Sequence, residues 1–106
     1  MIHMAEEKPV VHYYNGDNYR FALYVYDDDP ETVYLANVFV HKRSRGHGIG
    51  NNILATAEQE ALKMNADTLC LKCLKDSWVH DWYKEHGFED LCLDNNSKFM
   101  WMRKNI

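Results

Sequence analysis

The sequence lacks the features that mark membrane-spanning and secreted proteins. It has no apolar run approaching the ~18 residues that a membrane-spanning helix needs, and its first residues do not form a signal-peptide pattern. Its three cysteines are an odd number, which does not suggest a framework of disulfides. We therefore expect a soluble, cytoplasmic protein with reduced thiols and no membrane partner.

Excess basic charge and metal-binding patterns are also missing. The net charge of −4 argues against nucleic acid as the main partner. Cys70 and Cys73 lie in a predicted strand, where residues three apart point to opposite faces, and the histidines show no ligand spacing with the cysteines. The acidic residues 27–31 lack the alternating ligands and the glycine of a calcium loop. We expect no bound metal.

Apolar residues make up 46% of the chain and aromatic residues 13%, which is typical of a folded globular protein. A length of 106 residues suits one domain, expected over residues 10–106, with residues 1–9 as a flexible N-terminus. Hydrophobic periodicity predicts strands, a helix, a strand, a helix and further strands, which is an α/β class. The expected strands are 10–14, 19–26, 32–41, 68–74, 88–93 and 98–103, and the longer helix is 51–64.

Turn and cap residues separate these elements. Asn15-Gly16-Asp17 is a hairpin signal, and residues 27–31 are expected to interrupt the sheet as a loop. In the longer helix, Asn65 is a candidate C-cap. Asp76 or Ser77 is expected to cap a second, short helix that Gly87 ends. The apolar stripe of the longer helix is predicted to consist of Ile53, Leu54, Ala57, Ala61 and Leu62.

The most informative segment is Arg45-Gly46-His47-Gly48-Ile49-Gly50, which lies between a predicted strand and a predicted helix. Glycines allow tight turns and a close approach of the backbone to a ligand. The first N–H groups of a helix have no intrahelical partner, and the helix dipole favours an anion there. With the nearby charges of Lys42 and Arg43, the segment predicts a cradle for a pyrophosphate.

The spacing of this segment decides among nucleotide-binding families. A P-loop needs Gly-Lys-Ser/Thr, and no glycine here precedes a lysine. A dinucleotide fingerprint needs Gly-x-Gly-x-x-Gly, which the chain also lacks. Arg45-x-x-Gly48-x-Gly50 instead resembles the Arg/Gln-x-x-Gly-x-Gly/Ala signature of the GCN5-related N-acetyltransferase (GNAT) family. Later in the chain, Tyr83-x-x-x-Gly87-Phe88 resembles the end of that family's next helix, in the same order and at the family's spacing.

The resemblance implies a fold and a coenzyme. The sheet would be mixed, and the strands before and after the helix that follows the glycine segment would be parallel and splayed. The pantetheine arm of acetyl-coenzyme A would fill the gap between these two strands. On this expectation, backbone groups of the first strand bind pantetheine, and the glycine turn with the Arg45 side chain holds the pyrophosphate. The implied coenzyme-binding residues are Val38, Phe39, Val40, Arg45, Gly46, His47, Gly48, Ile49, Gly50 and Asn51.

The resemblance also implies catalytic roles. Tyr83 matches the family tyrosine that commonly lies near the thioester sulfur, where its phenol could protonate the leaving thiolate. The alternative is an ordinary buried aromatic. Many relatives use as a base a carboxylate on the strand before the glycine segment or on the strand after the following helix. In this chain Asn37 and Lys72 stand on those two strands instead. Asn37 is a candidate for ordering a catalytic water, or is an ordinary capping or core amide. His41 and His80 have suitable chemistry but are expected to be exposed, and Asp76 stands where many relatives have a coenzyme-contacting asparagine.

Family members usually have N-terminal helices that wall the acceptor side, and this chain shows only a hairpin there. An open groove suits a protein or peptide amine, or needs a second subunit to complete it, so a homodimer is possible. Two hypotheses follow. One is an acetyl-coenzyme A-dependent N-acetyltransferase acting on a primary amine of a protein, peptide or small molecule. The alternative is a non-catalytic module that binds coenzyme A or another protein.

Overall fold

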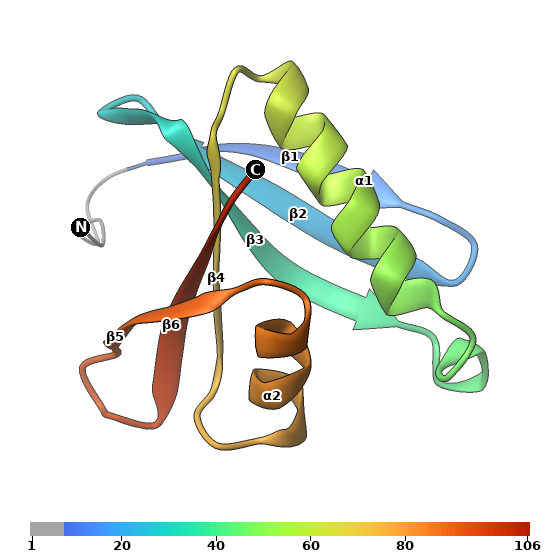
Figure 1. Ribbon diagram of the computed structural model, residues 1–106. Helices are drawn as coiled ribbons and strands as arrows, with labels where there is room; N and C mark the ends of the chain where they lie inside the picture. The colour runs from blue at the N-terminus through green and yellow to red at the C-terminus, as the bar shows by residue number, and fades with distance from the viewer. Residues whose placement is uncertain (1–7) are drawn as a thin grey trace.

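The computed structural model describes residues 8–106, so most of the segment predicted to be a flexible N-terminus lies outside the described residues. None of the described helices is both long and apolar enough to cross a membrane. The elements follow one another along the chain as shown in Figure 1. They are β1 (Val10–Asn15), β2 (Tyr19–Tyr26), β3 (Asp29–Val40), the 3-10 helix η1 (Lys42–Ser44), α1 (Ile49–Lys63), β4 (Thr68–Leu74), α2 (Trp78–Glu85), β5 (Glu89–Leu93) and β6 (Phe99–Asn105).

The described strands form one mixed sheet in the order β1-β2-β3-β4-β6-β5. The pair β3 and β4 is parallel, and the other neighbouring pairs are antiparallel. Both α1 and α2 pack against the same face of the sheet, as Figure 1 shows. No described helix covers the opposite face, which we call the helix-free face. The predicted fold class and element order are confirmed.

The central parallel pair is splayed, as predicted. Backbone pairing between β3 and β4 begins at Thr32 opposite Thr68 and ends at Tyr34 opposite Cys70. Beyond these positions β3 continues to Val40 and β4 to Leu74 without pairing with each other. The edges of the two strands that face this gap therefore have no partner strand, and Figure 1 shows the strands diverging.

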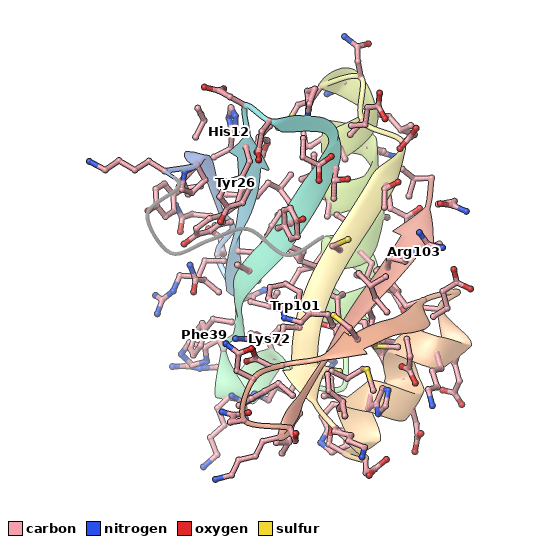
Figure 2. All side chains as sticks on the ribbon, turned by 90° about the vertical axis from the view of Figure 1, so that its left-hand side faces the viewer. His12, Tyr26, Phe39, Lys72, Trp101 and Arg103 are labelled. Atoms are coloured by element: carbon pink, nitrogen blue, oxygen red, sulfur yellow. The ribbon has the colours of Figure 1, made fainter. Side chains whose placement is uncertain are left out.

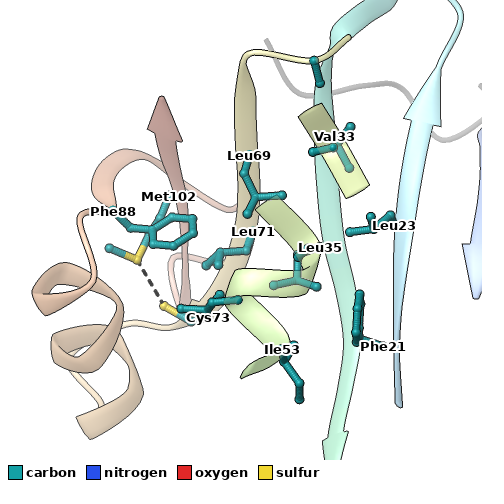
Figure 3. Close-up of a cluster of buried hydrophobic side chains, with 14 residues drawn as sticks. Phe21, Leu23, Val33, Leu35, Ile53, Leu69, Leu71, Cys73, Phe88 and Met102 are labelled. Carbon is teal, nitrogen blue, oxygen red and sulfur yellow. Dashed lines mark hydrogen bonds between the residues drawn. The ribbon is translucent and has the colours of Figure 1, made fainter. Parts of the chain in front are cut away.

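The core lies between the helix side of the sheet and α1 and α2. Figure 3 shows Leu23 and Val33 on one side of the gap, and Leu69, Leu71 and Met102 on the other. From α1 the predicted stripe is buried at Ile53, Leu54, Ala57 and Ala61. The prediction for Leu62 is wrong, because this side chain is 52% exposed. It lies about 100° around the helix from Ala61, beyond the width of the face that the sheet covers.

Several element boundaries differ from the sequence prediction. The turn between β2 and β3 is formed by Asp27 and Asp28 alone, so the loop predicted over residues 27–31 is too long. Pro30 falls where the pairing of β2 with β3 is irregular, and a proline is tolerated there because no ladder hydrogen bond is required of it. Helix α1 begins at Ile49 rather than residue 51. The short helix η1 was not predicted.

The burial difference between two leucines gives a test of the core. We expect Leu71→Ala to lower the free energy of unfolding by about 2–5 kcal/mol, because Leu71 is 2% exposed and its removal leaves a cavity beneath the helices. Leu62→Ala removes the same atoms from the surface of α1 and should cost less than about 1 kcal/mol. Urea denaturation measures both values, and equal losses would contradict this placement of the core.

Candidate active site

The turn between β3 and α1 depends on two glycines. Gly46 has φ 84° and Gly48 has φ 77°, which is the left-handed region that side chains other than glycine rarely adopt. A Cβ added at either position would meet no atom within 4 Å. Backbone conformation, rather than crowding, therefore requires glycine here. The turn stays open on the side where a Cβ would otherwise project.

Helix α1 begins with unused hydrogen-bond donors. Gly48 is its N-cap and provides no side-chain cap, and the Asn52 N–H donates to the Gly48 carbonyl over 3.3 Å. The N–H groups of Ile49, Gly50 and Asn51 precede this bond and have no intrahelical acceptor. Together with the positive end of the helix dipole, they form a site that favours an anion.

Basic residues surround this helix start. The Arg45 Nε donates a hydrogen bond to the Val40 carbonyl over 3.2 Å, which holds the side chain against the end of β3. Lys42 and Arg43 are exposed on η1, and the Arg43 N–H donates to the Nδ1 of His41 over 3.3 Å. His41 is exposed, as expected, and caps η1. The local charge is therefore positive although the whole chain is acidic.

A cavity of about 630 Å³ opens beside this turn, between β3, α1 and α2. It includes most of the predicted coenzyme-binding residues, whereas Phe39 and His47 do not line it. Trp78, Val79 and Trp82 of α2 also line it, and the sequence analysis assigned them no part in the site. The apolar character of these three residues on one short helix was the sequence signal that could have placed them at the cavity. The predicted site residues on the cavity wall are Val38, Val40, Arg45, Gly46, Gly48, Ile49, Gly50, Asn51 and Tyr83.

The two helices are held closely together at this cavity. A Cβ on Gly50 would lie 3.3 Å from the Trp82 ring, so glycine permits the close approach of α1 to α2. His86, which follows α2, donates from Nδ1 to the Trp82 carbonyl over 2.8 Å. Its Nε2 lies 2.7 Å from Oδ1 of Asn51 in the first turn of α1. These contacts fix the helix start relative to α2.

Tyr83 contributes the hydroxyl group of the cavity. Its ring makes edge contacts with Trp82 at 5.3 Å and Phe88 at 5.5 Å between centroids. Burial, reinforced by the nearby Cys73 thiol, raises the pKa of Tyr83 to about 12, so the phenol is protonated at neutral pH. The hydroxyl makes no hydrogen bond with any described residue, which leaves its proton available to a ligand.

Asn37 lies on the other side of the sheet. Between Arg20 and Ala22 of β2, the paired strand β3 contains one extra residue, which forms a β-bulge. Asn37 lies in this bulge and has φ 55°. Its Nδ2 donates to the Tyr24 hydroxyl over 3.1 Å on the helix-free face. Asn37 and Tyr83 therefore face opposite sides of the sheet, near the same gap between β3 and β4.

Lys72 also points to the helix-free face. Its Nζ lies 3.3 Å from Oδ2 of Asp94 and over the rings of Phe99 and Trp101, at 5.3 and 5.4 Å from their centroids. Figure 2 shows Lys72 beside Trp101 on this face. Asp94, which follows β5, thus places a carboxylate beside Lys72 on this face.

The expectation that His80 is exposed is wrong, because this residue is 2% exposed. Its Nδ1 accepts the Asp76 N–H over 3.0 Å, so the ring proton is on Nε2, which donates to Asp90 over 2.7 Å. Ser77, one of the two predicted caps, begins α2 by accepting the His80 N–H. His80 thus connects α2 to β5, and neither it nor Asp76 lines the cavity.

The cysteines are free thiols on different faces, as the strand alternation predicted. Cys73 lies on the helix side, with its sulfur 3.7 Å from the sulfur of Met102. Cys70 lies opposite Tyr34, and burial raises the pKa of the Cys70 thiol to about 11, so it stays protonated. Among residues 8–106, no three His, Cys, Asp or Glu side chains are grouped as a metal site.

A family model described as an acetyltransferase (GNAT) domain matches residues 5–90, and the chain therefore belongs to the GNAT acetyltransferase family. A comparison with curated proteins found no match. Solved structures share the fold at low sequence identity. A GNAT acetyltransferase from Elizabethkingia anophelis with acetyl-CoA bound is 17% identical, with a TM-score of 0.70 over 92% of this chain and 76% of that chain.

Two further structures show the same fold. The PaiA N-acetyltransferase from Thermoplasma acidophilum, in complex with coenzyme A, is 17% identical, with a TM-score of 0.74 over 92% of this chain and 61% of that one. The IAA acetyltransferase from Bacillus cereus is 16% identical, with a TM-score of 0.71 over 92% and 78% of the two chains.

The contact between His80 and Asp90 predicts a pH dependence of stability. The hydrogen bond from His80, followed by attraction to His80 and Lys84, lowers the pKa of the Asp90 carboxyl. A group whose pKa is lowered by folding stabilises the protein above its unfolded pKa, and this stabilisation is lost as the pH falls through the folded pKa, below about 4. Between pH 5 and about pH 3, Asp90→Asn should therefore lose less stability than the parent protein.

Urea denaturation at several pH values measures this difference. Asp17→Asn provides a control, since it removes a carboxylate from an exposed turn. Parallel acid destabilisation of the parent and Asp90→Asn would contradict the assignment of this contact.

Proposed function

We propose that the protein is an N-acetyltransferase that moves the acetyl group of acetyl-coenzyme A to a primary amine. The observation that carries this proposal is a single cavity shared by the donor-rich start of α1, the gap-facing residues of β3, and Tyr83. Membership of the GNAT acetyltransferase family supports the reaction class. The bound coenzymes of the Elizabethkingia and Thermoplasma structures support the choice of acyl donor.

The glycine turn is suited to the pyrophosphate of the coenzyme. The N–H groups of Ile49, Gly50 and Asn51 provide donors, and the left-handed glycines keep the backbone accessible. Arg45 uses Nε on the Val40 carbonyl, so its terminal nitrogens remain for a phosphate oxygen. We assign His47 to the outer side of the same phosphates, because it is exposed on the turn but does not line the cavity.

The gap in the sheet is suited to the pantetheine arm. Beyond Tyr34, β3 lacks a partner strand on its β4 side, so gap-facing backbone groups of Val38, Phe39 and Val40 can pair with pantetheine amides. Phe39 would contribute through its backbone, since its ring lies on the helix-free face beneath Arg20. Val38 and Val40 would additionally contact the arm with their side chains, which line the cavity.

The chemistry requires a neutral amine. Its nitrogen attacks the thioester carbonyl carbon, the carbon–nitrogen bond forms, and the carbon–sulfur bond breaks with its electron pair going to sulfur. Tyr83 donates its phenolic proton to the thiolate, and the amine releases a proton to solvent. Solvent then reprotonates Tyr83.

Asn37 is proposed to position the amine. Its Nδ2 is used by Tyr24, which leaves Oδ1 as an acceptor on the helix-free face. This oxygen can accept a hydrogen bond from the amine, or from a water that carries away the amine proton. An amide cannot remove the proton itself, so Asn37 orients the reacting groups and water is the final base.

The coenzyme site can be tested with Gly48→Val. A β-branched residue in the left-handed region costs roughly 1–2 kcal/mol, so the turn should rearrange and affinity for coenzyme A should fall about tenfold or more. Ala55→Val adds a β-branched side chain on the exposed side of α1 and should leave affinity unchanged. Calorimetry with coenzyme A, and with pantetheine as a ligand lacking the pyrophosphate, measures the effect. Equal affinity of the parent for the two ligands would exclude a pyrophosphate site.

The acid role of Tyr83 can be tested with Tyr83→Phe. This variant keeps the ring and its contacts with Trp82 and Phe88, so folding and coenzyme affinity should be preserved. Turnover should fall about 10²-fold, the lower end of what a general acid contributes. Tyr14→Phe is the control, because the Tyr14 hydroxyl bonds Glu60 outside the cavity. Unchanged turnover of Tyr83→Phe, with chemistry as the slow step, would remove Tyr83 from the mechanism.

One observation favours the non-catalytic alternative, which is that no carboxylate lines the cavity among the described residues. A module that binds coenzyme A without transferring acetyl would retain the glycine turn and show the same effect of Gly48→Val. Release of free thiol from acetyl-coenzyme A in the presence of a panel of amines distinguishes the two functions. Binding without amine-dependent thiol release would support the module.

A further inference from the structure

A second cavity, of about 490 Å³, opens on the helix-free face beside the bulge of β3. Val38, which lies in the bulge next to Asn37, lines both cavities. The size of this cavity lies within the roughly 300–1,000 Å³ range of small-molecule sites. Its wall is formed by Tyr13, Asn15, Arg20, Phe21, Ala22, Asn37, Val38 and Phe39.

Arg20 is the only charged residue among the described residues that line this cavity. Its guanidinium carbon lies 4.7 Å from the centroid of the Phe39 ring, a cation–π contact that orients the side chain. No acidic side chain in the described part of the chain pairs with Arg20. Its donors are therefore available to a ligand, and Asn15 and Asn37 add neutral polar groups.

Lys72 supplies a second cation on the same face, from β4 on the far side of the gap. Its ammonium lies 3.3 Å from a carboxylate oxygen of Asp94, so the pair adds little net charge to this face. Arg20, which has no acidic partner among the described residues, therefore sets the charge beside the place where the amine would approach the thioester. This arrangement repels acceptors that are cationic throughout, such as polyamines, and attracts an acceptor with a negative group.

We propose that the acceptor is a small primary amine that also bears a carboxylate, with the carboxylate bound by Arg20 and the amine placed at Asn37. This inference rests on the proposed acetyl transfer and names its substrate class. The carboxylate neutralises Arg20, and the amine donates a hydrogen bond to Oδ1 of Asn37.

Matched acceptors that differ only in the carboxylate test the proposal. The pairs are L-phenylalanine with phenethylamine, L-leucine with isoamylamine and L-alanine with ethylamine, and spermidine serves as a polycation. Thiol release from acetyl-coenzyme A gives kcat/KM for each acceptor. We expect the carboxylate member to exceed its partner by about tenfold or more in at least one pair. Preference for the amines or for spermidine would overturn the proposal.

Substitution of Arg20 tests whether this residue causes the preference for acceptors with a carboxylate. Arg20→Gln should lower kcat/KM for the preferred carboxylate acceptor by about 10- to 100-fold, in line with loss of a charged hydrogen bond. The same variant should leave the matched amine and the KM for acetyl-coenzyme A unchanged. Arg20→Lys should retain part of the preference. Lys63→Gln, which removes an exposed cation from α1, is the control.

A binding measurement separates failure of this inference from failure of the proposed function. The three amino acids and their N-acetyl derivatives are titrated by NMR into the parent and Arg20→Gln. Carboxylate binding that depends on Arg20 would support the anionic subsite even if no acetyl transfer occurred. Acetyl transfer without any dependence on Arg20 would overturn the inference and leave the proposed function intact. Absence of both transfer and carboxylate binding would overturn the inference as well.

Discussion

The separation of β3 from β4 beyond Tyr34 and Cys70 is the constraint on which the rest of the site depends. Unpaired strand edges inside a sheet are costly unless another group satisfies their hydrogen bonds. The bulge at Asn37 turns β3 further from the regular sheet, and α1 and α2 pack over one side of the resulting gap. A cavity therefore forms on each side of the same strand, and Val38 borders both.

Contacts outside the cavities keep the helices in position around the gap. Gly50 lets α1 approach Trp82, and the hydrogen bonds of His86 connect the end of α2 with the start of α1. At the other end of α2, His80 connects the helix to Asp90 of β5. The donors of α1 and the Tyr83 hydroxyl are thus carried by two rigid elements with fixed relative placement, which is the condition for precise binding of a reacting group.

Sequence reasoning predicted the features that depend on local chemistry. The periodicity of apolar residues gave the element order, and the spacing of Arg45, Gly48 and Gly50 placed a turn at the wall of the larger cavity. Features that depend on distant partners were missed. The burial of His80 requires Asp90, and the second cavity combines β1, β2 and β3 through Arg20 and its neighbours. The roles given to Tyr83, Asn37 and the coenzyme-binding residues remain predictions.

The two sides of the gap differ in solvent exposure, and each proposed step requires the exposure found on its own side. On the helix side, burial keeps the Tyr83 phenol protonated, which suits a proton donor to a thiolate leaving beneath α2. On the helix-free side, Asn37, Arg20 and Lys72 are exposed, which suits entry of a charged acceptor from water. No described helix covers this face, so in the proposed reaction side chains of the sheet would select among amines. Arg20, which lines the second cavity and has no acidic partner among the described residues, is suited to make that selection by charge.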